Sequence, residues 1–516
     1  MHSFFRTVVV LTFLSSGCSS QNDRNANTES GLVKIEINTS KQFQVIENFG
    51  ASDAWACQFT GLWPDAKKNA IADLLFSTDT FSNGTPKGIG LSLWRFNIGA
   101  GSAQQGEASG IKDEWRRAES FLEADGNYNW NRQAGQVWFL KAAQQRGVKQ
   151  FLGFLNSPPV NITENKKAFA DNGITNIDSS HYDELGKYTV EVIKGVKNMT
   201  GIDFNYISPA NEPQWDWSDG GQEGSPYTNE DIFGVVKSVS KALQQYNLSA
   251  QIIVPESGHI KYLLADEDKP GRGNQVTVFF NPSSPYYLGQ LSNVSKTVAA
   301  HSYFSTSPQA TAVSLRKNVA MRVASVPRTH YWQSEYCILG DNEGEIKGEK
   351  RDLGMDAAIY TANVIHKDLV YANATAWQWW LAVSPYDYKD GLVYIDKNKS
   401  DGNFYQSKML WALGNYSRFI RPGMIRVEAS IPQQAAGISA SAYIDDVSRK
   451  LVVVVVNASA NEQKVSLMNG EGTSATSFTQ CDMYITSESK NLQKQPASAG
   501  QLSVGPQTVV TLVTNY

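Results

Sequence analysis

Residues 205–256 contain the stretch from which the fold can be inferred. Residues 205–213 read NYISPANEP, residues 228–246 read TNEDIFGVVKSVSKALQQY, and residues 251–256 read QIIVPE. The middle segment has its apolar residues at helical spacing, with Ile232, Val235, Val236, Val239 and Leu243 on one face. The flanking segments are short apolar runs that end in polar residues, which is typical of buried strands. The order strand, helix, strand indicates a βαβ unit.

The same alternation extends in both directions along the chain. Strands are predicted at residues 45–55, 89–99, 150–156, 205–212, 251–256, 297–304, 329–336 and 374–383, and further amphipathic helices at 131–146 and 182–198. Eight such units with long loops predict a (β/α)8 TIM barrel over residues 46–420. A doubly wound sheet is the competing architecture, but eight strands without a dinucleotide fingerprint favour the barrel.

The pattern changes after Arg421. Residues 421–516 alternate short strand-like runs with Asn, Gly and Ser turns, which predicts an antiparallel β-sandwich. An additional strand within residues 33–45, most apolar at 33–37, precedes the barrel and could pair with that sandwich.

Composition excludes several classes of protein. Hydrophobic residues make up 41% and charged residues 19% of the 516, so the chain can bury a large core. Lys and Arg number 46 against 50 Asp and Glu, and this near balance argues against electrostatic capture of nucleic acid or anionic membranes. The 13 Trp, 22 Tyr and 22 Phe are consistent with a carbohydrate partner or with core packing.

The N-terminal segment predicts export from a bacterial cell. Residues 1–17 read MHSFFRTVVVLTFLSSG, a basic residue followed by an apolar run and small residues, as in a signal peptide. Cys18 follows in the position that a lipoprotein signal places for lipidation, although Ser15 stands where such boxes prefer Leu. Residues 19–32 suit a flexible linker. We therefore expect a lipid-anchored protein, in the outer membrane or facing the periplasm, or otherwise a secreted one.

The remaining cysteines show no metal-binding or disulfide pattern. Cys57, Cys337 and Cys481 lack CxxC spacing, so no zinc site is expected and buried thiols are the default interpretation. One disulfide among the three stays open.

Two predicted strands end in glutamate within distinctive contexts. The strand at 205–212 ends in Asn211-Glu212, and the strand at 329–336 contains Ser334-Glu335. In a barrel the carboxyl ends of the strands form the open mouth, so these two carboxyl groups would face each other there. Glycoside hydrolysis needs such a pair, with one carboxyl that donates a proton and one carboxylate that attacks the anomeric carbon. A solvated loop charge is the alternative for either glutamate alone.

Together with other motifs, this pair resembles glycoside hydrolase family 30, within the large clan of retaining barrel glycosidases. The motifs are NFGASDAW (48–55), GIGLSLWR (88–95), NSPP (156–159), HSY (301–303) and WQWW (377–380). The resemblance covers residues 32–516 and implies a barrel followed by a sandwich that recruits the N-terminal strand. It also implies Glu212 as acid/base, Glu335 as nucleophile, and no cofactor or metal.

The phrases FGASDAW and NSPP are most similar to the endo-β-1,6-galactanase branch of that family. A polysaccharide, such as β-galactan side chains, is then the expected partner of a monomeric enzyme. β-1,6-Glucan and xylan remain alternative substrates. A non-catalytic glycan-binding lipoprotein is the alternative from another functional class.

Four further polar residues fit around the two glutamates. Asn211 would bond the sugar 2-OH, and Arg95 would hold the Glu335 carboxylate in place. Tyr303 would donate a hydrogen bond to Glu335, and His301 would line the sugar site or be structural.

Aromatic side chains supply candidate sugar platforms. Trp377 and Trp379 alternate onto one face of their strand, so one of them would stack on a sugar, whereas Trp380 points the other way and is expected in the core. Trp55 is a candidate second platform. Asp53 is a further candidate for substrate binding.

Overall fold

The structure is a computed structural model that describes residues 32–340, 342–432, 435–470 and 481–516. The predicted export segment, the lipidation residue Cys18 and nearly all of the predicted linker lie outside the described residues.

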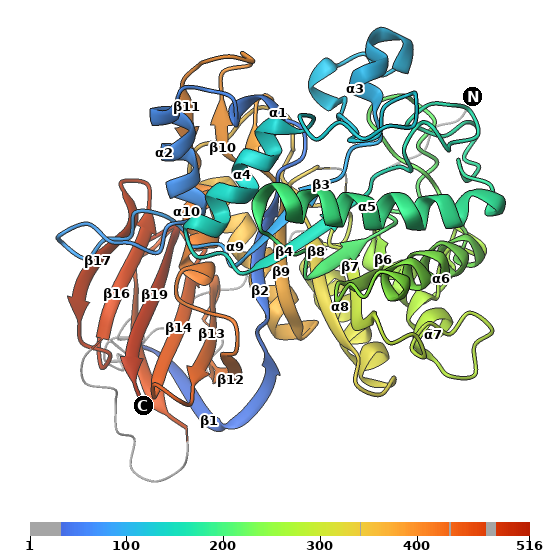
Figure 1. The fold of residues 1–516 in the computed structure, drawn as a ribbon. Coiled ribbons are helices and arrows are strands. Elements are labelled where there is room, and N and C mark those ends of the chain that lie inside the picture. The colour runs from blue at the N-terminus through green and yellow to red at the C-terminus, as the bar shows by residue number, and fades with distance from the viewer. Residues whose placement is uncertain (1–31, 341, 433–434, 471–480) are drawn as a thin grey trace, which may run out of the picture.

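A closed parallel barrel forms the larger part of the molecule (Figure 1). Its eight strands follow chain order, and the barrel closes because the last strand pairs with the first, β9 with β2. The strands are β2 (Asn48–Ser52), β3 (Leu93–Asn97), β4 (Gln150–Phe154), β5 (Tyr206–Ser208), β6 (Gln251–Ser257), β7 (Val294–His301), β8 (His330–Glu335) and β9 (Ala374–Ser384). The predicted TIM barrel is thereby confirmed.

The helices of the barrel lie between and around these strands. They are α1 (Cys57–Thr60), α2 (Asp65–Phe76), α3 (Ser102–Gln105), α4 (Ala134–Gln145), α5 (Tyr182–Thr200), α6 (Asn229–Gln245), α7 (Gln275–Phe280), α8 (Gln309–Ala324), α9 (Met355–Tyr371) and α10 (Lys408–Ser417).

Helix α6 begins as its sequence predicts. The side chain of Thr228 accepts a hydrogen bond from the Asp231 backbone N–H, and the Asp231 carboxylate accepts one from the Thr228 backbone, which satisfies two unpaired donors of the first turn. The predicted apolar face, including Ile232 and Val239, is fully buried. Helices α5 and α6 pack side by side on the barrel (Figure 1).

The C-terminal strands form a second sheet of nine strands with β1 (Val33–Val45) inserted in it. Its order is β17-β16-β19-β14-β13-β12-β1-β15-β18, with β12 (Ile425–Ser430), β13 (Ile438–Asp445), β14 (Lys450–Asn457), β15 (Gln463–Asn469), β16 (Cys481–Ser487), β17 (Lys490–Ala497), β18 (Leu502–Val504) and β19 (Thr508–Asn515). The N-terminal strand pairs antiparallel with β12 and parallel with β15, so its recruitment is confirmed.

Strand β14 connects the two parts of the core. Its run LVVVVV is buried on both faces: Val453 and Val455 belong to the same buried cluster as Ile35 of β1, while Val452 and Val454 belong to the apolar core of the barrel. A strand covered on both sides reads as a continuous apolar run rather than an alternating one. The sheet therefore packs directly on the barrel, against α9 and α10.

An extension of the barrel sheet was not predicted. Strand β10 (Gly391–Ile395) pairs parallel to the C-terminal half of β9, and β11 (Phe404–Gln406) pairs antiparallel to β10. The connection between β9 and β10, residues 385–390, is thereby held at the carboxyl end of the barrel.

The three predicted thiols are free and buried in the structure, so no disulfide links Cys57, Cys337 and Cys481. None of the helices in the described ranges is long and apolar enough to cross a membrane.

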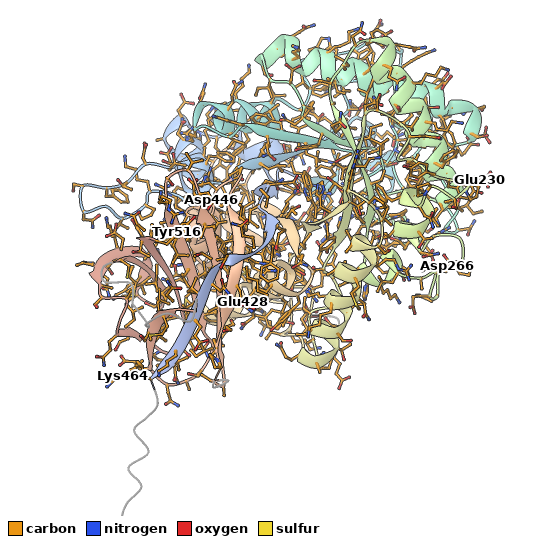
Figure 2. All side chains as sticks on the ribbon, turned by 90° about the horizontal axis from the view of Figure 1, so that it is seen from below. Glu230, Asp266, Glu428, Asp446, Lys464 and Tyr516 are labelled. Carbon is orange, nitrogen blue, oxygen red and sulfur yellow. The ribbon has the colours of Figure 1, made fainter. Side chains whose placement is uncertain are left out.

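Figure 2 shows Glu230 and Asp266 at the edge of the barrel, far from the sheet that carries Lys464 and Tyr516.

Candidate active site

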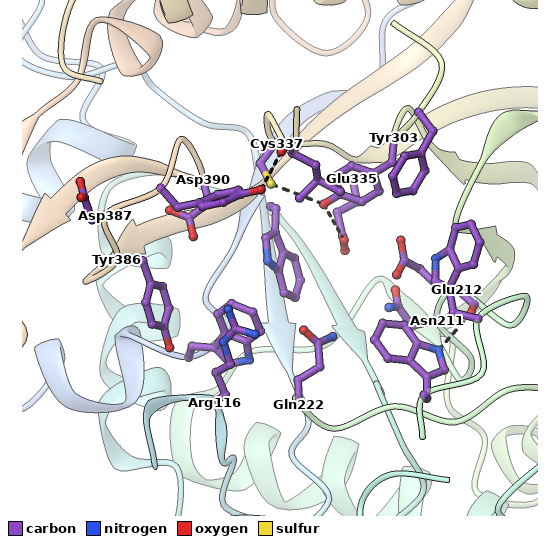
Figure 3. Close-up of a pocket in the computed structure, with 17 residues that line it drawn as sticks. Arg116, Asn211, Glu212, Gln222, Tyr303, Glu335, Cys337, Tyr386, Asp387 and Asp390 are labelled. Carbon is purple, nitrogen blue, oxygen red and sulfur yellow. Dashed lines mark hydrogen bonds between the residues drawn. The ribbon is translucent and has the colours of Figure 1, made fainter. Parts of the chain in front are cut away.

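Glu212 and Glu335 meet at the carboxyl end of the barrel. Glu335 is the last residue of β8, and Glu212 lies in the loop that follows β5. One carboxylate oxygen of each lies within 4.8 Å of the other. Figure 3 shows the two carboxyl groups pointing towards one another across a pocket. The two residues are far apart in the sequence, so only closure of the barrel brings them together.

Glu335 is held from two sides. Arg95, in β3, forms an ion pair with its Oε2 through Nη1, and the Tyr303 hydroxyl donates to its Oε1 at 3.0 Å. The guanidinium of Arg95 is fully buried, lies 4.1 Å from the centre of the Phe154 ring, and donates through Nη2 to Asn211 Oδ1 at 3.1 Å. Arg95 and Tyr303 thus contact the carboxylate for which the sequence proposed them, whereas the predicted bond of Asn211 to a sugar 2-OH stays a prediction.

Glu212 is bound differently. His301 Nδ1 lies 2.8 Å from Glu212 Oε1, and the Trp217 indole N–H donates to the Glu212 backbone oxygen at 3.1 Å. Burial raises the pKa of Glu212, against the lowering effect of the His301 hydrogen bond. Its backbone has φ +44°, a left-handed conformation that is uncommon for a residue with a side chain and concentrates at functional sites.

His301 lies beneath the pocket rather than in its wall. The ring is fully buried and lies between three carboxylates, with Nδ1 also 3.5 Å from Glu335 Oε1. Burial lowers the pKa of His301, but Glu335 and then Glu212 and Glu256 outweigh it and raise the pKa to about 10. Of the two alternatives that the sequence left open for His301, these contacts favour a structural role beneath the carboxylates over a place in the wall of the sugar site. The positive charges of Arg95 and His301 also leave these carboxylates poorly suited to a metal cation.

The pocket has a volume of about 540 Å³ and is rich in aromatic side chains. Trp215 packs edge to face against Phe304, and Trp217 bonds to the Glu212 backbone, whereas Trp55 packs edge to face against both Trp380 and Tyr386. Trp215 and Trp217 were missed by the sequence-based prediction. Their spacing in the loop directly after Glu212, QWDW, is the signal that could have found them.

The assignment of the β9 tryptophans to the sugar site was wrong. Trp377 and Trp379 are fully buried outside the pocket, and their indole N–H groups donate to Asp368 of α9 at 3.0 Å and to the Asp390 backbone oxygen at 2.7 Å. Trp380, expected in the core, lines the pocket. Alternation separates the two faces of a strand but does not say which one faces inward.

Trp55 lies where it was expected and Asp53 does not. Trp55 lines the pocket, meets Trp380 edge to face at a centroid distance of 5.4 Å, and has the Arg116 guanidinium 4.6 Å from its ring centre. Asp53 is fully buried behind the pocket, and its Oδ1 accepts from Asn97 N at 2.7 Å and Gln136 Nε2 at 3.2 Å. Burial raises the pKa of Asp53 to about 8.

The far end of the pocket carries polar groups that the sequence did not single out. Arg116, Tyr386, Asp387 and Asp390 lie there, the last three in the connection between β9 and β10 (Figure 3). Burial raises the pKa of Asp390 to about 7. These residues line the pocket because the unpredicted β10 extension holds their loop at the barrel mouth.

Comparison with known proteins places this geometry in a family. The sequence model of O-glycosyl hydrolase family 30 matches residues 32–394. A conserved exported protein from Bacteroides fragilis has a similar structure, with a TM-score of 0.85, 33% identity and coverage of 93% of this chain and 100% of that one.

More distant relatives carry named activities. A glucuronoxylanase of Bacillus subtilis (strain 168), XynC, is 22% identical over 481 residues, which cover 89% of this chain and 85% of that protein. The structure of an endo-β-1,6-glucanase is similar with a TM-score of 0.65 and 14% identity, covering 93% of this chain and 94% of that one. At such identities the likeness to solved structures concerns the fold.

Proposed function

The chain belongs to glycosyl hydrolase family 30, and on that premise we propose that it cleaves a β-linked polysaccharide by double displacement with retention of configuration. Glu335 is the nucleophile and Glu212 the acid/base. The observation that carries the proposal is the closeness of their carboxylate oxygens, within 4.8 Å. Retaining glycosidases hold their carboxyl groups about 5–5.5 Å apart, and inverting ones about 6.5–9.5 Å.

The residues around the pair have defined tasks in the first step. The Glu335 carboxylate attacks the anomeric carbon, the bond from that carbon to the leaving oxygen breaks, and protonated Glu212 gives its proton to that oxygen. Arg95 and Tyr303 orient the attacking carboxylate through the contacts described above. The raised pKa of Glu212 fits a group that must be protonated when it donates.

In the second step the roles of Glu212 reverse. Water attacks the anomeric carbon of the glycosyl-enzyme, Glu212 takes the proton of that water, and the bond to Glu335 breaks to release the sugar. Several aromatic side chains line the pocket that contains the pair, which suits the binding of sugar rings.

We propose β-1,6-galactan as the substrate, cleaved internally. The phrases FGASDAW and NSPP, which resemble the endo-β-1,6-galactanase branch, support this choice. β-1,6-Glucan and xylan are the alternatives, favoured by the names of two relatives, an endo-β-1,6-glucanase and a glucuronoxylanase. Release of reducing ends from purified β-1,6-galactan, β-1,6-glucan and glucuronoxylan tests all three, and release from galactan alone is expected.

Two variants and one spectrum test the mechanism. Glu335→Gln should lose activity on every glycoside, because no covalent intermediate can form. Glu212→Ala should lose activity on poor leaving groups while keeping the first step on activated aryl glycosides. Proton NMR of the first product should show the β anomer, and an α product would rule out retention. Binding of glycan without any hydrolysis by the wild type would favour a non-catalytic glycan-binding protein.

We also propose that the protein is exported and carries a lipid on Cys18. The signal-like segment 1–17 supports this, as does the similarity to a protein described as exported. Expression in a bacterial host with labelled palmitate should give a labelled protein that Cys18→Ala abolishes. An unlabelled protein with an N-terminus created elsewhere would instead indicate simple secretion.

A further inference from the structure

A third glutamate, Glu256, lies beneath the two at the pocket. It is on β6, is fully buried and does not line the pocket. Ser208 Oγ donates to its Oε1 at 2.6 Å, and Ser334 Oγ, from the residue before Glu335, donates to its Oε2. Its backbone oxygen accepts from the Glu212 N–H at 2.8 Å. Glu256 therefore contacts both segments that carry the proposed catalytic carboxyl groups.

The same carboxylate faces both buried cations. His301 Nε2 lies 3.3 Å from Glu256 Oε2, and Arg95 Nη2 lies 3.9 Å from the same oxygen. The other titratable groups facing this cluster are Glu212 after β5, Glu335 and Tyr331 on β8, and Tyr303 after β7. Burial raises the pKa of Glu256, but Arg95 and His301 outweigh it and lower the pKa to about 2. Glu256 is thus ionised throughout the working pH range.

An ionised Glu256 determines what His301 presents to Glu212. The ionised Glu256 carboxylate can only accept a hydrogen bond, so the His301 Nε2 that faces it must carry a proton. The second nitrogen, Nδ1, lies 2.8 Å from Glu212 Oε1 and 3.5 Å from Glu335 Oε1, so it also faces carboxylate oxygens. Anionic groups on both sides of the ring favour its doubly protonated form.

The protonation of Nδ1 then selects the oxygen of Glu212 that holds the transferable proton. If Nδ1 carries a proton, it donates to Oε1, and the proton of the Glu212 carboxyl resides on Oε2. If the ring is neutral with its proton on Nε2, Nδ1 accepts instead and draws the Glu212 proton onto Oε1, towards the buried ring and away from the pocket.

We propose that Glu256 is a positioning residue that keeps His301 doubly protonated, so that the transferable proton of Glu212 stays on the oxygen that faces the substrate. The inference rests on the proposed function of Glu212 as acid, and concerns a residue that acts through His301 rather than on the sugar.

The first test compares leaving groups in the Glu256→Gln variant. General acid catalysis contributes about 10²–10⁴-fold, so at about pH 9, where the lowered pKa of His301 leaves its ring with one proton, the variant should lose up to about 10–100-fold in kcat/KM on an oligosaccharide with a poor leaving group. On a dinitrophenyl glycoside of the same sugar, which needs no acid, it should stay within about threefold of the wild type. Equal losses on both substrates would indicate a merely structural role and overturn the proposal.

The second test observes His301 itself. In wild-type protein labelled with ¹⁵N-histidine, both ring nitrogens of His301 should be protonated at neutral pH, with the signal assigned by its absence in His301→Gln. In Glu256→Gln the pKa of His301 should fall by about 1–3 units, the effect of removing a close opposite charge. A wild-type ring with one proton at neutral pH would overturn the proposal, and so would a shift below about half a unit.

Two variants control for lost packing. Glu256→Asp keeps the charge, so His301 should remain doubly protonated and the dependence on the leaving group should stay near that of the wild type. Glu223→Gln removes another buried carboxyl, which accepts from Ser102 Oγ at 2.5 Å and from the Ala100 N–H at 2.9 Å in a different loop. It should leave both the leaving-group dependence and the His301 signal unchanged.

The outcomes separate this inference from the proposed function. If wild-type protein hydrolyses no glycoside, or if Glu212→Ala shows no dependence on the leaving group, the proposed function fails. If wild-type protein is active, Glu212→Ala depends on the leaving group, and Glu256→Gln loses the same activity on both substrates, only the role of Glu256 fails. The wild-type NMR measurement does not depend on activity or on the folding of Glu256→Gln.

Discussion

Asp53→Asn should make the stability of the protein less sensitive to pH. Asp53 is fully buried, and burial raises its pKa from 3.8 to about 8, although Asn97, Gln136 and Arg95 oppose this effect. Between those two values the unfolded chain has lost the proton of Asp53 while the native protein retains it. The unfolded state then binds fewer protons, so the free energy of unfolding falls as pH rises through this window.

The size of the effect follows from linkage. One proton corresponds to about 1.4 kcal/mol per pH unit, so wild-type protein should lose roughly 3–4 kcal/mol between about pH 5 and about pH 7.5 through Asp53. Asparagine does not titrate and keeps the carbonyl oxygen that accepts from Asn97 and Gln136. The stability of Asp53→Asn relative to wild type should therefore rise by that amount across the same range.

Urea unfolding of both proteins at several pH values measures this difference. Asp268→Asn is a control of opposite sign, because the hydrogen bond from Lys261 lowers the pKa of Asp268 to about 2. The stability that Asp268 contributes is fully present above the pKa of Asp268 in the unfolded chain, which lies below this pH range. Asp268→Asn should therefore be less stable than wild type by an amount that stays constant over the range. If the difference in the free energy of unfolding between Asp53→Asn and wild type did not change with pH, and the variant bound substrate more weakly, Asp53 would have to be assigned to the sugar site after all.

Four further substitutions test the assignments in and around the pocket. Trp380→Ala should lower kcat/KM by about tenfold because its ring lines the pocket. Trp379→Ala removes a side chain that is fully buried outside the pocket, so it should act through stability and lower the free energy of unfolding by about 3–5 kcal/mol. A larger loss of kcat/KM for Trp379→Ala than for Trp380→Ala would restore the original assignment. Trp217 lines the pocket and its indole contacts the backbone of Glu212. Trp217→Ala should therefore raise KM for oligosaccharides more than for a small aryl glycoside. An equal rise in KM for both substrates would show that Trp217 does not bind the sugar beyond the scissile bond. Arg95→Met leaves Glu335 and Glu256 buried without that cation. It should therefore abolish turnover and lower the free energy of unfolding, measured by denaturation, by about 3–5 kcal/mol. A stable and active variant would contradict the role of Arg95.

The barrel and its glutamate pair could be predicted because topology alone brings them together. Strands of a closed parallel barrel end at one rim, so two glutamates at strand ends meet whatever the loops do. Glu212 and Glu335 needed only correct strand assignments. Tyr303 lies two residues beyond the end of β7, whereas Arg95 lies in the middle of β3, and both were found through the family motifs HSY and GIGLSLWR.

The errors have a different physical origin. Strand β9 is buried along its whole length, so its sequence lacks the polar face that would identify the outward side. Trp377 and Trp379 were therefore assigned to the wrong face. Asp53 precedes the predicted platform Trp55, and nothing in its neighbours reveals that the carboxyl turns away from the pocket. Trp215 and Trp217 lie in a loop whose conformation depends on contacts made elsewhere in the chain.

In the proposed mechanism, the charges of the buried cluster favour a proton on Glu212 in the free enzyme. Arg95 and His301 supply two positive charges, and ionised Glu256 and Glu335 supply two negative ones, so the cluster is neutral while Glu212 is protonated. Ionisation of Glu212 would leave one net negative charge in a buried site, which burial penalises. In the proposed glycosyl-enzyme, Glu335 is bonded to the sugar and carries no charge, so the cluster has one net positive charge. Ionised Glu212 then restores neutrality, so the same arrangement that makes it an acid in the first step makes it a base in the second.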